Sequence, residues 1–350
     1  MDAQRERGLD VGRTVANYLI VLLHAWGAAI QYADPSSAEG RTWTFVGVNA
    51  CAGLFALFLI SGHLLFRGFS LAAWPAKMAR RLRRLAVPYV LWNALFVALY
   101  LGAAQLFPRV QERVDAFALS TPAGAFARVL DPFVMPLDVP LWFVRTIFVF
   151  AIFAPLFWLF LRHRVGRWIG LAAVVGLWLA TDVVRCLPDC PAYRSSALAV
   201  FYVGGLLAVL GRRVVDVFRS PGWLLVGAAG FAFDLAEAFG CGSVMEMNGR
   251  LVLKSTILFH LLARAEGASW TTSGWFRKAT EAAFFVYAGH FLFCSAWVHL
   301  LGPRLASFSD GRLTLLMIAV CVPGLATVFA ARGLLRRVLP RTLRLFDGTL

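Results

Sequence analysis

Residues 43–66 read WTFVGVNACAGLFALFLISGHLLF and contain no Asp, Glu, Lys or Arg. An α-helix rises 1.5 Å per residue, so about 20 apolar residues cross the ~30 Å hydrocarbon core of a bilayer. Because lipid offers no hydrogen-bond partners to backbone N–H and C=O groups, such a segment crosses the membrane as a helix. The segment therefore predicts an integral membrane protein built from helices.

The composition of the whole chain agrees with that segment. Of the 350 residues, 60% are hydrophobic and only 15% are charged, and the mean hydropathy is +0.71. Soluble domains carry about 25% charged residues, which cover their surfaces. A chain with so little polar surface is excluded as a soluble enzyme, a disordered protein or a coiled coil.

Nine further apolar segments extend the prediction along the chain. We expect an all-α, polytopic transmembrane bundle of about ten spans, forming one membrane domain over residues 1–350 with no appended soluble domain. Residues 108–138 form the longest break between spans and are predicted to be an extramembrane loop with a short helix. The predicted spans are 14–33, 43–66, 86–107, 140–161, 168–185, 195–211, 221–239, 250–266, 281–301 and 312–332.

Basic residues are unevenly distributed between the predicted loops. The chain has 34 Lys and Arg against 19 Asp and Glu, a formal net charge of +15. If the N-terminus lies in the cytoplasm, and if residues at the ends of spans are counted with the adjoining loops, 23 of the basic residues fall on the cytoplasmic side and nine fall outside, while Arg145 and Lys254 lie within spans. Cytoplasmic loops of membrane proteins carry such an excess. The charge therefore predicts cytoplasmic N- and C-termini, and no nucleic-acid partner is needed to explain it.

The six cysteines predict no metal centre, because the Cys and His residues together do not have the spacing of a zinc site. Cys186, Cys190 and Cys241 fall in predicted outer loops, where the compartment allows disulfides. Cys186 could pair with Cys190, or one of these two with Cys241. The sequence leaves open which bridge forms, if any.

The first predicted span carries the clearest polar pattern. Arg13, Asn17 and His24 lie at offsets of zero, four and eleven residues, which places them within about 40° on one side of a helix. His24 lies ~16 Å beyond Arg13, near the middle of the membrane. A neutral imidazole accepts a proton near neutral pH, which suits a general base. The alternative is a histidine that only packs against a neighbouring helix.

Other charged side chains within spans have a structural explanation. Asp234 and Glu237 share one face of the seventh predicted span, and Lys254 lies at a similar depth in the eighth. Ionisable groups inside a bilayer are costly unless they are paired or functional. We therefore expect an ion-pair cluster between these two antiparallel spans.

Five stretches of the sequence, in chain order, resemble landmarks of the acyltransferase 3 family. The first span of that family carries an Arg, ten intervening residues and a His, as Arg13 and His24 do here. The chain departs from the family pattern at His63, where a family member usually has Phe after Ser-Gly. The stretches are LDVGRTVA at 9–16 with LLH at 22–24, LFLISG at 57–62, RRLRRLAVPY at 80–89, LWF at 141–143 and VYAGHF at 286–291.

The resemblance implies an integral-membrane O-acyltransferase. Such enzymes take an acyl group, commonly acetyl, from cytoplasmic acyl-CoA and transfer it to a hydroxyl of an extracytoplasmic glycan or lipid-linked sugar. The expected location is the inner membrane of a bacterium. Acetyl-CoA is the expected co-substrate, with no metal, and the partners are acyl-CoA, the acceptor and the lipid bilayer. The acceptor sugar and the acyl length are left open.

The same resemblance assigns roles to the matched residues. His24 would activate the acceptor hydroxyl or relay the acyl group, and Arg13 would meet a CoA phosphate or the thioester oxyanion. A guanidinium fork suits phosphate recognition. The basic inner loop could equally contact anionic lipid. The expected CoA-binding residues are Arg80, Arg81, Arg84 and His63.

Four further residues are expected to bind the substrate. His290 shares a helical face with Tyr287 and Cys294, and its alternative role is packing. Arg145 either holds an anionic acceptor or extends toward the membrane surface. The expected substrate-binding residues are Asn17, Trp142, Arg145 and His290.

Two other functions are compatible with ten spans. A secondary transporter or a flippase of a glycan-type substrate also uses ionisable groups in mid-membrane, but the sequence shows no inverted repeat with matching broken helices. A non-catalytic scaffold does not need a polar stripe with a histidine inside the membrane. Consumption of a CoA thioester separates the enzyme from the transporter.

Overall fold

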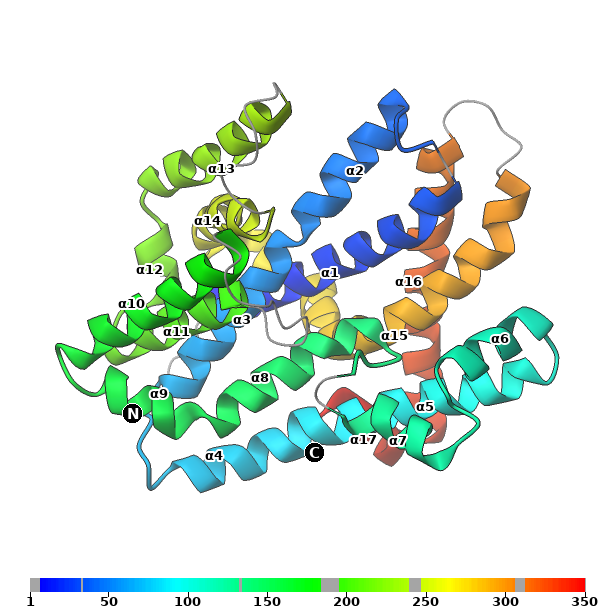
Figure 1. Ribbon diagram of the computed structural model, residues 1–350, viewed down its shortest axis with the longest axis horizontal. Coiled ribbons are helices and arrows are strands. Elements are labelled where there is room, and N and C mark those ends of the chain that lie inside the picture. Colours follow the sequence, from blue (N-terminus) through cyan, green and yellow to red (C-terminus); the bar gives the residue numbers. More distant parts are fainter. Residues whose placement is uncertain are drawn as a thin grey trace.

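The computed structural model describes residues 7–32, 34–131, 134–183, 195–238, 247–305 and 312–349. Within these ranges the chain forms helices joined by turns, and no strand occurs (Figure 1). The predicted all-α fold is therefore confirmed. Cys186, Cys190 and Cys241 lie outside the described residues, so their pairing stays a prediction.

The helical elements follow one another closely along the chain. In the first half they are α1 (Arg7–Ala29), η1 (Ile30–Tyr32), α2 (Ala38–Ala50), α3 (Ala52–Phe66), α4 (Trp74–Arg81), η2 (Leu82–Ala86), α5 (Val87–Ala104), α6 (Pro108–Ala116), α7 (Pro122–Leu130), η3 (Val139–Leu141), α8 (Trp142–Ile152) and α9 (Ala154–Leu161). In the second half they are α10 (Gly166–Trp178), η4 (Leu179–Val183), α11 (Ser195–Val209), α12 (Val214–Phe218), α13 (Gly222–Ala238), α14 (Met247–Ala265), η5 (Ser269–Thr272), α15 (Gly274–Leu305), α16 (Arg312–Val338) and α17 (Pro340–Asp347).

Five helical stretches of the described residues are long and apolar enough to cross a membrane. A sixth is formed if α8 and α9, with the turn before them, count as one span bent by 59°. A helix occupies each of the ten predicted segments, but several are short, so the count of ten spans stays a prediction. The five stretches are Arg7–Tyr32, Ala38–Phe66, Trp74–Ala104, Gly274–Arg304 and Leu313–Val338.

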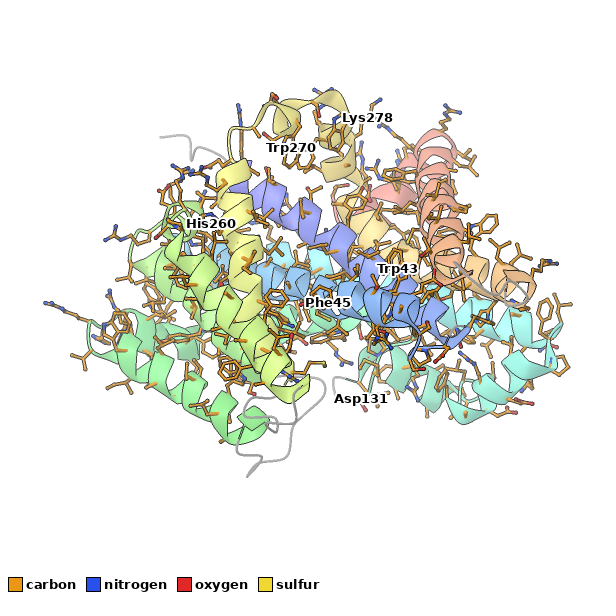
Figure 2. All side chains as sticks on the ribbon, turned by 90° about the horizontal axis from the view of Figure 1, so that it is seen from above. Trp43, Phe45, Asp131, His260, Trp270 and Lys278 are labelled. Carbon is orange, nitrogen blue, oxygen red and sulfur yellow. The ribbon has the colours of Figure 1, made fainter. Side chains whose placement is uncertain are left out.

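Large apolar side chains cover the outside of these helices. Phe45 on α2, labelled in Figure 2, is 56% exposed. Exposed apolar side chains in such number are unfavourable in water, and in a bilayer they face lipid. With the long apolar helices, it identifies the chain as an integral membrane protein. Other exposed members of this surface are Leu99, Leu156, Trp168, Ile169, Leu225, Leu261, Ile318 and Val322.

Helix α1 lies at the centre of the bundle (Figure 1). It packs against α2, α3, α14, α15 and α16. The other extensive helix pairs are α3 with α11, α13 with α14, and α15 with α16. The polar stripe of α1 therefore lies among helices from both ends of the chain.

Helices α3 and α11 approach each other through glycine. A Cβ atom added at Gly62 would overlap the carbonyl oxygen of Phe201, and one added at Gly204 would overlap the carbonyl oxygen of Leu59. Small residues allow such close backbone approach between membrane helices, where van der Waals packing replaces the hydrophobic effect as the driving force. Gly62 belongs to the Ser-Gly stretch that the sequence singled out.

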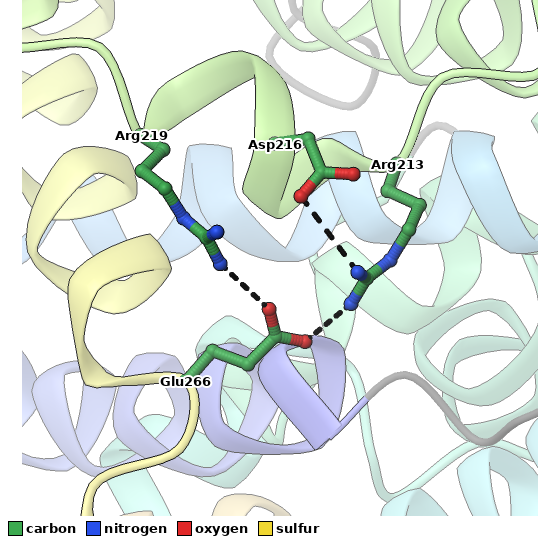
Figure 3. Close-up of polar contacts among 4 residues, drawn as sticks. All are labelled: Arg213, Asp216, Arg219 and Glu266. Carbon is green, nitrogen blue, oxygen red and sulfur yellow. Dashed lines mark hydrogen bonds and ion pairs between the residues drawn. The ribbon is translucent and has the colours of Figure 1, made fainter.

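Ion pairs join α12 to the end of α14. Glu266 accepts hydrogen bonds from Arg213 at 2.5 Å and from Arg219 at 3.2 Å, and Arg213 also lies 3.7 Å from Asp216 (Figure 3). Exposed pairs contribute little individually. Here one carboxylate, only 15% exposed, is shared by two arginines. The two ion pairs of Glu266 hold α12 beside the end of α14. The charge pattern of the sequence predicts that this end of the bundle is cytoplasmic.

The predicted ion pair between the seventh and eighth segments is present. Lys254 donates to Asp234 at 2.6 Å, and Arg250 lies 3.3 Å from the other oxygen of the same carboxylate. The side chain of Glu237 lies outside the described residues. The pair therefore joins α13 to α14, as expected for a structural cluster.

Residues 108–138 differ from the predicted extramembrane loop with one short helix. They contain two short helices, α6 and α7, and their end is buried: Leu137 is 5% exposed and Asp138 is 0% exposed. Non-helical backbone is tolerated inside a membrane bundle where protein surrounds it. Here the Oδ1 atom of Asn93 accepts the backbone N–H of Asp138 at 3.3 Å.

Alanine at the close approach is expected to destabilise the bundle. Gly204→Ala would insert a methyl group against the backbone of α3, and overpacking of this kind costs about 1–3 kcal/mol. Gly176→Ala in α10 is the control, because nothing lies within 4 Å of its added Cβ. We expect thermal unfolding in detergent to show a lower Tm for the first variant and an equal or higher Tm for the second. If Gly204→Ala and Gly176→Ala had the same Tm, the close approach of α3 and α11 would be contradicted.

Candidate active site

The polar stripe of α1 faces α15 in a constant register. The Thr14 hydroxyl donates to that of Thr280 at 3.0 Å, and the Asn17 amide donates to the carbonyl of Ala283 at 3.4 Å. The next pair of polar residues with the same separation in the sequence is His24 and His290. Because the separation does not change along the seam, α1 and α15 run parallel, and this contact places the two histidines together.

The imidazole rings of His24 and His290 are neighbours. Their centroids lie 5.3 Å apart and their planes are tilted by 42°. Phe291 adds an edge contact to His24 at 5.6 Å. His24 is partly exposed and His290 is completely buried. Two residues that the sequence placed 266 positions apart therefore form one local pair in an apolar environment.

The backbone of α15 fixes the orientation of His290. Its Nδ1 atom lies 2.6 Å from the carbonyl oxygen of Tyr287 and 3.1 Å from that of Val286. The hydroxyl of Tyr287 donates to the carbonyl of Pro140, in the turn that begins the bent span. The Tyr-x-x-His stretch thus holds two polar groups at defined positions beside the Leu-Trp-Phe stretch.

A cavity of about 180 Å³ begins near the same seam. Five helical segments line it, and each contains one of the five stretches that resemble the family. Its polar lining comes from Arg13, Asn17, Ser61, Arg81 and Tyr287. Arg13 also forms an ion pair with Asp10 at 3.9 Å. The cavity therefore brings Arg13, Asn17 and Arg81 together, as the sequence predicted for one site.

The position of Arg81 depends on α4 and the turn after it. Trp74 donates to the carbonyl of Ala151 at 3.0 Å, and Lys77 donates to the carbonyls of Leu65 and Arg67 at the end of α3, both at 2.8 Å. A π-helical turn, η2, follows Arg81. Turns of this type re-aim side chains and occur often at functional sites. The guanidinium of Arg81 consequently enters the bundle, 3.5 Å from the Ser61 carbonyl.

Other predicted site residues lie around the cavity rather than in its lining. Arg80 and Arg84 are exposed beside Arg81. His63 is 2% exposed, and its backbone lies against Gly204 in the α3–α11 interface. Trp142 packs on Phe58 with ring centroids 6.0 Å apart. Their roles in binding stay predictions.

Arg145 is buried and only partly satisfied. It is 7% exposed, and its Nη1 group donates to the carbonyls of Asp131 and Val134. Its Nε and Nη2 groups have no hydrogen-bond partner among the described residues. A buried guanidinium with spare donors can receive an oxygen-rich ligand. The side chain is enclosed by protein, and its role in binding stays a prediction.

Asp138 is a buried acid that the sequence analysis did not single out. It is 0% exposed, and neither carboxylate oxygen has a hydrogen-bond partner in the part of the chain that the structure describes. It precedes the bent span, and burial raises its pKa well above the ordinary value. The only signal in the sequence is an acid four residues before Trp142 of the Leu-Trp-Phe stretch.

Comparison with known protein families shows to which family the chain belongs. The model of the acyltransferase domain of the acyltransferase 3 family matches residues 6–332, which is most of the 350-residue chain. The chain belongs to the acyltransferase 3 family. Comparisons with curated proteins and with solved structures give no match.

This acyltransferase 3 match includes every stretch on which the resemblance rested. It extends from the start of α1 to within α16, and it leaves α17 outside. The chain is therefore a membrane-embedded acyltransferase. His24, His290 and the cavity that contains Arg13 and Arg81 all lie within the matched residues.

Replacing Asp138 in this acyltransferase by asparagine tests its protonation. Because the pKa of the folded-state carboxyl is raised, the folded chain holds a proton that the unfolded chain loses above about pH 4. Stability then falls as pH rises through that range. Asp138→Asn, which cannot ionise, should raise the Tm at pH 7 and flatten its dependence on pH, as measured by thermal unfolding at pH 4–7.

The control for this change is Asp115→Asn. Asp115 is exposed on α6, so its replacement should leave the Tm at pH 7 close to that of the wild type. A lower Tm at pH 7 for Asp138→Asn would instead mean that the folded protein requires an ionised carboxylate at this position.

Proposed function

We propose that this acyltransferase moves an acyl group, of which acetyl is the favoured form, from cytoplasmic acyl-CoA to a hydroxyl of an extracytoplasmic glycan or lipid-linked saccharide. Its place would be the inner membrane of a bacterium, with both termini in the cytoplasm. The observation that carries the proposal is the contact between the His24 stripe on α1 and His290 on α15, beside a cavity whose polar lining includes two arginines.

The arginine-rich part of the cavity suits the donor. CoA carries several phosphate charges, and Arg80 and Arg84 are exposed beside Arg81. Arginine binds phosphate through a planar fork of N–H donors. A cavity of about 180 Å³ is smaller than the 300–1,000 Å³ that encloses a whole drug-sized ligand. We therefore place the nucleotide outside and only the acyl-bearing arm in the cavity.

His24 would act as the general base. It would accept the proton of the acceptor hydroxyl while the hydroxyl oxygen attacks the thioester carbonyl carbon. The C–S bond then breaks, and the proton passes from His24 to the CoA thiolate, so that an ester and free CoA result. Arg13 would stabilise negative charge on the carbonyl oxygen or on CoA. Charge stabilisation of this kind is stronger in a site that excludes water.

The acceptor would meet the site from the side of Trp142 and Arg145. The spare Nε and Nη2 donors of Arg145 suit hydroxyl or anionic oxygens of a sugar. An aromatic ring such as Trp142 offers an apolar face with one polar edge. Asn17, which lines the cavity, would contact the substrate between the two sides.

Loss of the His24 imidazole is expected to abolish transfer. General-base catalysis contributes roughly 10²–10⁴-fold, so His24→Ala should reduce incorporation of labelled acetyl from acetyl-CoA into the glycan fraction by about that factor. His299→Ala is the matched control, since His299 is exposed and contacts only Tyr32 among the residues for which bonds are described. If wild type and His24→Ala incorporate the same amount of labelled acetyl, the proposed mechanism is wrong.

Loss of Arg81 is expected to weaken donor binding. A hydrogen bond to a charged group is worth about 1.5–3 kcal/mol, so Arg81→Ala should raise the KM for acetyl-CoA about tenfold or more. Arg83→Ala is the control, because Arg83 is exposed and does not line the cavity. Steady-state release of free CoA thiol measures both. If the two variants had the same KM for acetyl-CoA, the donor would not bind beside Arg81.

A further inference from the structure

We infer that His290 is a positioning residue for His24: in the substrate-bound site its Nε2 atom accepts the N–H of the His24 ring and so directs the other His24 nitrogen at the acceptor hydroxyl. The inference rests on the proposed function and assigns His290 a role other than contact with substrate. It follows from the tautomer of His290, from its burial, and from its Nε2 atom, which has no hydrogen-bond partner among the described residues.

The tautomer of His290 is determined by its neighbours. A carbonyl oxygen can only accept a hydrogen bond, and Nδ1 lies within 3.1 Å of two such oxygens, those of Val286 and Tyr287. Nδ1 therefore carries the hydrogen. In the neutral imidazole the second nitrogen, Nε2, is then a hydrogen-bond acceptor.

The Nε2 atom of His290 is buried without a partner among the described residues. Burying an acceptor without a hydrogen bond costs free energy, so such a group in a native fold calls for a functional explanation. Two polar groups near His290 on α15 have contacts elsewhere. Tyr287 donates to Pro140, and Cys294, one turn further along α15, faces Gly324 on α16.

The His24 ring is the donor within reach. The centroid distance of 5.3 Å leaves the two rings in contact range, although no direct hydrogen bond joins them. Catalytic hydrogen bonds are often long in structures without substrate and tighten when it binds. Phe291 covers one side of His24, which keeps the environment apolar and strengthens a bond between the rings.

This arrangement has a clear chemical consequence. When His24 takes the proton from the hydroxyl it becomes positively charged, and the lone pair on Nε2 of a neutral His290 stabilises that charge. No proton moves to His290, and it returns unchanged. The role corresponds to that of the residue that orients the histidine in a catalytic triad, where loss of the correct tautomer lowers the rate by about 10⁴.

Two substitutions of His290 separate the functions of its two nitrogens. His290→Asn keeps a donor near the Nδ1 position and removes the acceptor at Nε2. His290→Gln places an amide oxygen near Nε2. We expect His290→Asn to reduce thiol release from acetyl-CoA about 100-fold or more with KM within about twofold, and His290→Gln to recover at least about tenfold of that loss.

The second measurement does not depend on transfer. Diethyl pyrocarbonate modifies the unprotonated nitrogen of histidine, and the mass of the modified peptide reports its rate at His24 in the purified protein with acetyl-CoA bound. We expect this rate to fall several-fold in His290→Asn. A residue that only contacts substrate would leave it unchanged. His260→Asn is the matched control, because His260 is also buried and its Nδ1 atom bonds a backbone carbonyl, that of Phe218, at 2.9 Å.

The outcomes distinguish this inference from the proposed function. Wild-type thiol release by His24→Ala would overturn the proposed function. A defect in His24→Ala with no defect in His290→Asn, or unchanged His24 reactivity, would overturn the inference alone. If His290→Asn does not fold, His290→Gln decides: activity within about tenfold of wild type supports the acceptor role, and a loss as large as that of His24→Ala contradicts it.

Discussion

The seam between α1 and α15 is the contact on which the site depends. Lipid does not drive apolar helices together as water does, so polar pairs and small residues determine which faces meet and in which register. Thr14 with Thr280 and Asn17 with Ala283 provide such contacts at one end of the seam. A slip of one residue would rotate His24 by about 100° away from α15. The hydrogen bonds that join two spans therefore also set the geometry of the histidines.

Local patterns in the sequence were sufficient to predict the helices and the stripe. Apolar runs predict spans because the thickness of the membrane fixes their length, and the spacing of Arg13, Asn17 and His24 predicts one polar face whatever lies opposite. The helix that packs against this polar face could not be predicted from the sequence. His290 lies 266 residues away, and no local periodicity in α15 states that it meets α1. By contrast, the ion pair of Asp234 with Lys254 could be predicted, because α13 and α14 are consecutive helices and so pack as antiparallel neighbours.

Two features that depend on contacts between several helices could also not be predicted from the sequence: the buried end of the 108–138 segment and the inward position of Arg81. The buried end of the 108–138 segment resembles a surface loop because it contains prolines and acids. Its burial depends on Asn93, which accepts the Asp138 N–H, and on Tyr287, which donates to Pro140. Neither partner is a neighbour in the sequence. The inward position of Arg81 likewise requires Trp74 and Lys77 to hold α4 against α8 and α3.

The proposed transfer across a membrane would bring donor and acceptor groups together inside the bundle, out of water, and this restricts the base that can be used there. A carboxylate at such a point would be strongly destabilised unless its charge is balanced. Asp138 illustrates this cost, because it is fully buried, its carboxylate oxygens have no hydrogen-bond partner among the described residues, and burial raises its pKa. Imidazole is neutral in its resting form and is charged only while it holds the proton. A second neutral imidazole can stabilise that transient charge without adding a permanent one. A pair of histidines on the α1–α15 seam thus leaves the resting site without charge, whereas an ionised carboxylate beside a neutral histidine would leave it with one negative charge.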